Sequence, residues 1–150
     1  AWLGCGPQQA KRLWQTVSSD IVPVRAAGKA RHVLAADLDA LRAAACDTGA
    51  WRMLGSHDPY LDLRDRAVLL DDVQRQRIVW QTVSNPGALI CGGRIAGVWR
   101  QKQQKTALSV EMVLFEPADA AARQALEQEA AHYAAFRGAA LRAVAFQQAG

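Results

Sequence analysis

A glycine pair between two apolar runs constrains the fold of this chain more than any other feature. Ala88–Cys91 and Arg94–Arg100 are both rich in strand-forming residues, and Gly92-Gly93 between them is typical of a two-residue hairpin turn. Alternating apolar residues in Thr106–Phe115 predict a further strand. The second part of the chain is therefore expected to form a small antiparallel or mixed, barrel-like β domain.

The other elements of this domain follow from shorter signals. We expect a strand at Trp51–Leu54, a turn at the polar and basic stretch Gln101–Lys105, and a short helix capped by Asp71-Asp72. Pro117 opens a long C-terminal helix to about Arg137, and Leu141–Gln147 is expected to be a closing strand. The expected apolar face of the long helix is Ala122, Leu126, Ala130, Tyr133 and Phe136. The tryptophans expected to anchor cores are Trp14, Trp51, Trp80 and Trp99.

The first part of the chain has a different pattern. Apolar residues at helical spacing predict a helix over Gln8–Ser18, and the β-prone runs Ile21–Arg25 and Arg31–Leu34 predict a hairpin around Gly28. Asp37 can cap a second helix to about Cys46. This order is that of the latter half of a winged helix-turn-helix. We therefore expect an α+β chain with a partial winged-helix module at residues 1–49 and the β domain at residues 50–150.

Charge is concentrated in two segments, although the net charge of +4 over 150 residues is modest. Basic residues dominate between Lys11 and Arg31, and between Arg94 and Lys105 there is no acidic residue. A solvated face is the commoner meaning of any single charge run, but such clustering is also one footprint of a nucleic-acid partner. Together with the expected winged-helix module, it favours double-stranded DNA as the partner. The candidate DNA-binding residues are Lys11, Arg12, Gln15, Arg25, Lys29, Arg31, Arg100, Lys102 and Lys105.

A polar loop between the expected strands carries the remaining candidates. His57-Asp58 could form an acid–base pair, but adjacent side chains usually point apart and Pro59 favours a structural turn. Arg64-Asp65-Arg66 could equally clamp a phosphate or brace the loop through ion pairs. The residues to which either a phosphate contact or loop bracing applies are His57, Asp58, Tyr60, Arg64 and Arg66.

Several classes of protein do not fit the sequence. The three cysteines are far apart and His32 and His132 are isolated, so we expect neither a disulfide framework nor a metal site, and no cofactor motif is present. The longest apolar runs are shorter than a membrane span requires, and reduced cysteines suit the cytoplasm. We expect a cytoplasmic protein that is associated with the nucleoid when bound to DNA.

An ordered set of motifs resembles the C-terminal region of the winged-helix family that includes the AlkZ/YcaQ-type DNA glycosylases. The motifs are His57-Asp58-Pro59-Tyr60-Leu61, Arg64-Asp65-Arg66, Asn85-Pro86-Gly87 and Gly93-Arg94-Ile95-Ala96-Gly97-Val98-Trp99-Arg100. Trp2-Leu3-Gly4 with the first helix, and Val33–Leu38 after the wing, are similar to the last winged-helix module of that family.

This resemblance implies a scaffold of tandem winged-helix modules ending in a β domain, in enzymes that remove bulky alkylated or cross-linked purines. It also implies a catalytic Gln-x-Gln or Gln-x-Asp near the start of the full chain, which this sequence lacks. Gln74-Arg75-Gln76 and Gln101-Lys102-Gln103 match the Gln-x-Gln pattern, but they lie in the C-terminal part, so no catalytic role is assigned to them.

We therefore expect a fragment that is inactive alone, has no catalytic residue, and binds DNA together with other winged-helix modules of the same parent chain. Two alternatives stay open. One is a winged-helix DNA-binding protein without glycosylase activity, and the other is a protein-interaction or scaffold module.

Overall fold

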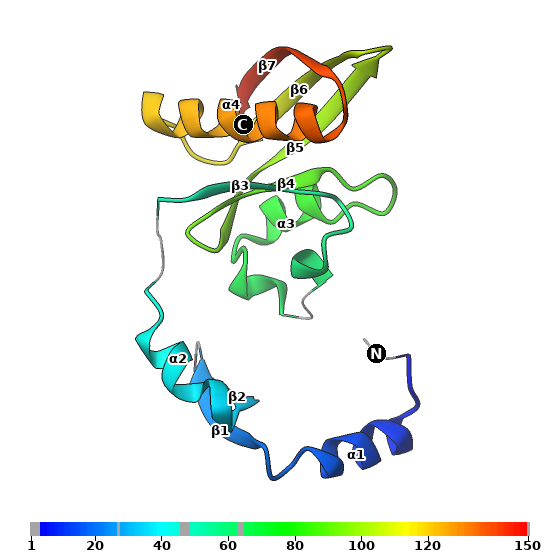
Figure 1. Ribbon diagram of the computed structural model, residues 1–150, viewed down its shortest axis with the longest axis vertical. Helices are drawn as coiled ribbons and strands as arrows, with labels where there is room; N and C mark the ends of the chain where they lie inside the picture. Colours follow the sequence, from blue (N-terminus) through cyan, green and yellow to red (C-terminus); the bar gives the residue numbers. More distant parts are fainter. Residues whose placement is uncertain (1–3, 27, 46–48, 63–64, 150) are drawn as a thin grey trace. The chain divides into compact units, whose positions relative to one another are not determined.

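The computed structural model describes residues 4–26, 28–45, 49–62 and 65–149, shown as ribbons in Figure 1. The fold is α+β, as expected. The chain divides into two compact units, Ala1–Ala45 and Cys46–Gly150. That the first unit is a winged-helix module stays a prediction.

The first unit is a helix, a hairpin and a second helix. Helix α1 is Pro7–Thr16, with the proline in its first turn, where a missing N–H costs nothing. Strands β1 (Ile21–Ala26) and β2 (Lys29–Leu34) pair antiparallel from Ile21↔Leu34 to Ala26↔Lys29. The strands therefore reach closer to Gly28, whose φ is +74°, than the sequence predicted.

The second helix of this unit is shorter than expected. A 3₁₀ turn, η1 (Ala35–Asp37), leads into α2 (Leu38–Ala43). The predicted capping by Asp37 is wrong, because the 3₁₀ turn holds this residue in a helical conformation and its side chain makes no capping hydrogen bond. The expected end at Cys46 lies outside the described residues.

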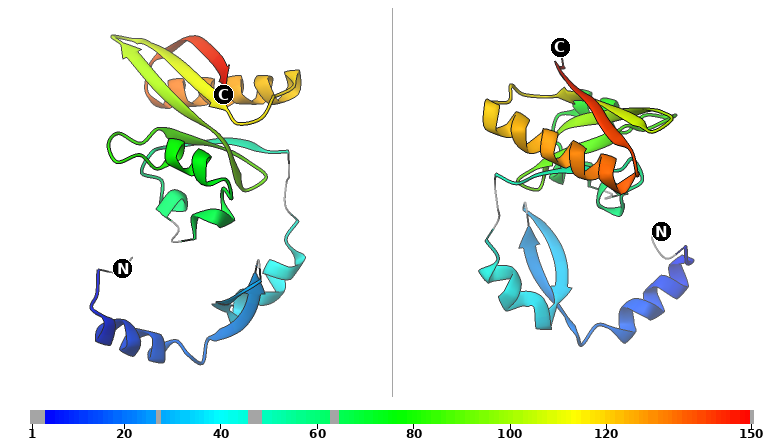
Figure 2. Two further views of the ribbon diagram at one scale, coloured as in Figure 1. Left: turned by 180° about the vertical axis from the view of Figure 1, so that it is seen from behind. Right: turned by 45° about the horizontal axis from the view of Figure 1, so that its top comes forward.

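The second unit is built on a five-stranded mixed sheet in the order β3-β4-β5-β6-β7. The strands are β3 (Trp51–Leu54), β4 (Gly87–Cys91), β5 (Arg94–Gln104), β6 (Ala107–Leu114) and β7 (Ala140–Gln148). The first four are antiparallel neighbours, and β7 runs parallel to β6 after helix α4 (Ala120–Phe136). The sheet is open and not the barrel-like sheet that we expected, because the crossover through α4 places β7 beside β6 and away from β3 (Figure 2).

The β5–β6 hairpin is longer than predicted. We expected Gln101–Lys105 to be a turn, but Gln101 to Gln104 extend β5 and pair with Val110 to Ala107. The chain reverses at Lys105, whose φ is +52°. The polar composition misled the prediction, because an exposed sheet face accepts polar residues as readily as a turn does.

Both faces of the sheet bury apolar side chains. On one face α4 packs its Leu126, Ala130 and Ala134 against strand residues that include Trp99 and Met112. On the other face lie α3 (Val73–Val79) and two 3₁₀ turns, η2 (Pro59–Asp62) and η3 (Arg66–Val68), whose region supplies Leu69 and Val79 to a second core.

Two expectations about packing were wrong. Phe136 does not belong to the buried face of α4, since its side chain is 85% exposed, and Ala134 continues the four-residue spacing instead. Trp99 is buried and Trp51 and Trp80 pack partly against the cores, but Trp14 is 51% exposed. The helix that carries Trp14 buries none of its residues, so its apolar face does not meet a core.

Two carboxylates accept hydrogen bonds from backbone N–H groups in the second unit, one at the N-terminus of α3 and one at the edge strand β3. Asp72 caps α3, as expected, by accepting hydrogen bonds from the backbone N–H of Gln74 (2.8 Å) and Arg75 (3.1 Å). These bonds lower the pKa of Asp72 below its ordinary value, and the nearby Arg75 charge adds to the effect. Glu129 of α4 accepts a hydrogen bond from the backbone N–H of Met53 in β3 (3.1 Å).

Candidate nucleic-acid interface

The β5–β6 hairpin presents the basic residues predicted in the second unit. Arg100 and Lys102 alternate with Trp99 and Gln101 along β5, and Lys105 lies at the turn. All three basic side chains are exposed. The guanidinium of Arg100 donates to Gln81 Oε1 and to the carbonyl oxygen of Ser84, both at 3.0 Å. Arg100 thus ties down the loop before β4, while Lys102 and Lys105 extend from the hairpin.

The candidates of the first unit lie on α1 and on the β1–β2 hairpin. Lys11, Arg12 and Gln15 share the polar side of α1 by their spacing, and all are exposed. Trp14, on the apolar side of the same helix, makes an edge-to-face contact with His32 of β2, with ring centroids 5.1 Å apart. The remaining candidates of this unit are exposed residues of the hairpin strands: Arg25, Lys29 and Arg31.

The loop after β3 holds its candidates in contacts with the rest of the unit. Asp58 Oδ1 accepts a hydrogen bond from the backbone N–H of Tyr60 (2.9 Å), and the Tyr60 hydroxyl donates to the Gly93 carbonyl oxygen (2.9 Å). The Arg66 guanidinium lies 4.7 Å from the centre of the Trp80 ring. These contacts support loop bracing over phosphate binding, although both roles stay predictions. Arg64 lies outside the described residues, and His57 is exposed in the same loop.

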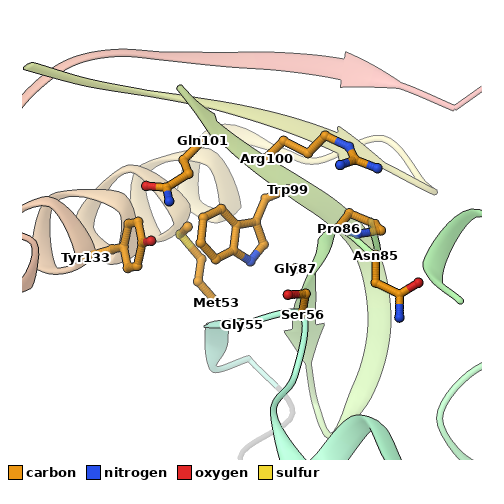
Figure 3. Close-up of a pocket in the computed structure, with 10 residues that line it drawn as sticks. All are labelled: Met53, Gly55, Ser56, Asn85, Pro86, Gly87, Trp99, Arg100, Gln101 and Tyr133. Carbon is orange, nitrogen blue, oxygen red and sulfur yellow. The ribbon is translucent and has the colours of Figure 1, made fainter. Parts of the chain in front are cut away.

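A pocket of about 350 Å³ lies beside Trp99, and sequence reasoning missed it. Figure 3 shows Gln101 and Tyr133 on one side of the indole and Asn85 with Pro86 on the other. The indole N–H donates to the Leu54 carbonyl oxygen (2.8 Å), and the ring meets Tyr133 edge-on with centroids 4.9 Å apart. Four separate segments of the chain line the pocket, so no local motif could have signalled it. Its described lining offers aromatic and amide groups but no carboxylate or imidazole for acid–base chemistry.

Potential metal ligands do not gather anywhere in the described part of the chain. Residues 4–26, 28–45, 49–62 and 65–149 contain no cluster of three or more potential metal-binding His, Cys, Asp or Glu side chains. Within the same ranges, no helix has both the length and the apolar character that crossing a bilayer requires.

This α+β fold, with a basic helix and hairpin in the first unit and an open mixed sheet in the second, is similar to that of a DNA glycosylase of known structure. The DNA glycosylase AlkZ of Streptomyces sahachiroi matches 95% of this chain with a TM-score of 0.68 and 21% sequence identity. At that identity the match concerns the fold, and this chain spans 38% of the length of that protein. The model of the AlkZ-like DNA glycosylase family matches residues 1–136, so the chain belongs to this family. No curated protein matches the sequence.

Membership of this family confirms the resemblance inferred from the ordered motifs between His57 and Arg100.

Proposed function

We propose that this chain is the DNA-binding part of a DNA glycosylase that removes bulky alkylated or cross-linked purines. The match of the AlkZ-like family model to residues 1–136 carries this proposal. The exposed basic residues on α1, on the β1–β2 hairpin and on the β5–β6 hairpin support it, because a protein that holds duplex DNA needs cations along the phosphate backbone.

The two units divide the contacts. In the first unit, the polar side of α1 with Lys11, Arg12 and Gln15 approaches a groove, and the β1–β2 hairpin acts as the wing, with Lys29 near its tip. In the second unit, Lys102 and Lys105 of the β5–β6 hairpin contact phosphates. Other winged-helix modules of the parent chain complete the grip on double-stranded DNA, in the cytoplasm at the nucleoid.

Base excision itself belongs to another part of the parent protein. Excision needs a group that positions or activates water beside the sugar, and the resemblance implies a Gln-x-Gln or Gln-x-Asp near the start of the full chain. We therefore expect the 150-residue chain to release no base from an alkylated duplex, while the full-length protein does so. Abasic sites formed by the purified 150-residue chain, at a rate that follows its concentration, would place the catalytic group within it.

Duplex binding is tested in the full-length protein with the double variant Lys102→Ala/Lys105→Ala. The slope of log K against log salt concentration is expected to flatten by up to about 0.9 for each of the two lysine–phosphate interactions that the variant removes. Arg77→Ala serves as the control, because it removes one exposed cation from α3, where the side chain contacts Gln74.

Unchanged affinity and an unchanged slope in the double variant would show that the β5–β6 hairpin does not contact DNA. If the full-length protein bound no duplex at any salt concentration, the alternative of a protein-interaction module would replace the proposal.

A further inference from the structure

Three polar residues, Lys102, Ser109 and Arg142, lie at neighbouring positions of the adjacent strands β5, β6 and β7. Lys102 in β5 pairs with Ser109 in β6, and Ser109 pairs with Ala143 in β7. The pairing register of β6 and β7 shifts between Leu108 and Ser109, because Leu108 pairs with Leu141. Arg142 is the extra residue at this bulge.

The bulge places Arg142 on the open face of the sheet. Leu108 and Val110 are buried towards α4, so Ser109, which alternates with them, faces the opposite way. Arg142 lines the same shallow pocket of about 250 Å³ as Lys102 and Ser109, together with Ala107. β-Bulges commonly redirect a side chain beside a functional site, and the shift here does so for Arg142.

The described helices leave this end of the sheet uncovered. In both Figure 1 and the left view of Figure 2, the hairpin end where β5 leads into β6 extends away from α3. Helix α4 lies on the face of the sheet opposite to α3. Lys102 and Arg142 are exposed, and Ser109 and Ala107 between them are half-buried and small. A ligand can therefore approach the strand backbone closely at Ser109 while long side chains flank it.

The charge and spacing of these three residues suit an anion. Adjacent strands lie about 4.8 Å apart, so the backbones of β5 and β7 are roughly 10 Å apart, and a lysine and an arginine can converge over the strand between them. Within residues 4–26, 28–45, 49–62 and 65–149, no carboxylate forms an ion pair with Lys102 or Arg142. Glu111 lines the same pocket, opposite Arg100 in the register, and its charge opposes an anion there.

We propose that Lys102, Ser109 and Arg142 bind one backbone phosphate of double-stranded DNA on the open face of the sheet. Lys102 and Arg142 supply the positive charge, and the Ser109 hydroxyl donates a hydrogen bond to a phosphate oxygen. This site rests on the proposed DNA-binding function and adds Ser109 and Arg142 to it. It also places the contact on the sheet face, so the cation of Lys105 at the hairpin turn is not part of it.

The experiment measures duplex affinity across salt concentrations in the full-length protein. Arg142→Ala is expected to flatten the salt slope by about 0.9, and Arg142→Lys to retain it, because the first variant removes the cation at the phosphate and the second keeps it. Ser109→Ala removes a hydrogen bond to a charged group and is expected to weaken binding about tenfold without changing the slope. Glu111→Gln removes the opposing charge and is expected to strengthen binding. Arg77→Ala is the matched control.

The outcomes separate this site from the proposed function. If the wild-type protein binds duplex with a salt-dependent affinity, while Arg142→Ala and Ser109→Ala match it in affinity and slope, the phosphate site is wrong and the proposed function stands. If the wild-type protein binds no duplex, both are wrong. Thermal unfolding of each variant identifies any loss of binding that is caused by unfolding. If a variant is unfolded, Glu111→Gln provides the test in its place: duplex affinity equal to that of the wild type would show that the phosphate site is wrong.

Discussion

The two units of this chain differ in how far their apolar side chains are buried. Every buried apolar residue of the described chain lies in the second unit, between Leu61 and Ala134, whereas no described residue of the first unit is buried. In the first unit, Leu13 and Trp14 of α1 and Val17 directly after it are all exposed. Stability is therefore concentrated in the five-stranded unit, while the basic side chains are distributed over both.

Separating the units is the strongest test of this division. Residues 46–150 expressed alone are expected to unfold in a single cooperative thermal transition, because both cores belong to them. Residues 1–45 alone are expected to show no such transition, since a hairpin and two short helices without a core do not offset the entropy of ordering the chain. Circular dichroism melts measure both. A cooperative transition in residues 1–45 would show that the first unit has a core of its own.

Replacing one leucine in each unit compares how much a single apolar side chain contributes to stability in the two units. Leu126→Ala empties a fully buried position between α4 and the sheet and is expected to cost about 2–5 kcal/mol of unfolding free energy. Leu41→Ala, at a side chain that is 56% exposed in α2, is expected to change it by about 0.5 kcal/mol or less. Urea unfolding of the 150-residue chain measures both values. Equal costs would contradict the concentration of stability in the second unit.

The packing of the second unit also depends on a glycine. A Cβ at Gly87 would meet the indole nitrogen of Trp99 and the carbonyl oxygen of Leu54, so Gly87→Ala would separate the two groups that form the indole hydrogen bond. We expect the free energy of unfolding to fall by about 1–3 kcal/mol. Gly55→Ala is the control, because a Cβ there meets nothing. If urea midpoints fall equally for the two variants, close packing at Gly87 is not what holds Trp99.

A weaker effect concerns one helix cap in each unit. The pKa of Asp72 is lowered, so its capping contributes stability above its unfolded pKa, and that stability is lost as the pH falls through the lowered pKa. Asp72→Asn should therefore be less stable than wild type near neutral pH, with the gap closing in acid. Asp37→Asn is the control in the first unit, because the Asp37 side chain makes no capping hydrogen bond. A gap for Asp72→Asn that stays constant from neutral to acid pH in urea unfolding would contradict the ionic cap.

Local sequence signals predicted most helices and strands, although the Asp37 cap and the turn at Gln101–Lys105 were wrong, and they did not predict which distant strands pair. The Gly92-Gly93 turn, the strand at Trp51–Leu54 and the Asp72 cap each depend on a few adjacent residues, and the sequence predicted all three. The closing strand was also expected, but its parallel partner was not, because nothing in residues 140–148 specifies β6 over another neighbour.

The candidate site shows the same division between local and long-range information. The sequence indicated Lys102 through a charge run, but Arg142 lies forty positions away, and only the bulge between β6 and β7 brings it to the pocket that Lys102 lines. The pocket beside Trp99 is lined by residues from four segments, and the contact between Trp99 and Tyr133 depends on how α4 lies on the sheet. Such sites follow from register, which the sequence pattern leaves open.

The hydrogen bond from the Met53 N–H to Glu129 bears on whether the sheets of two molecules can pair edge to edge. An open sheet ends in two strands with unpaired backbone groups, and these can add a strand from another chain and seed aggregation. On β3 the Glu129 carboxylate already occupies the outward N–H of Met53 and lies 3.8 Å from the Arg52 guanidinium, so an incoming strand would have to displace a charged pair. On β7 the bulge at Arg142 interrupts the regular edge and adds a positive charge. Each border of the sheet thus carries its own obstacle to edge-to-edge association.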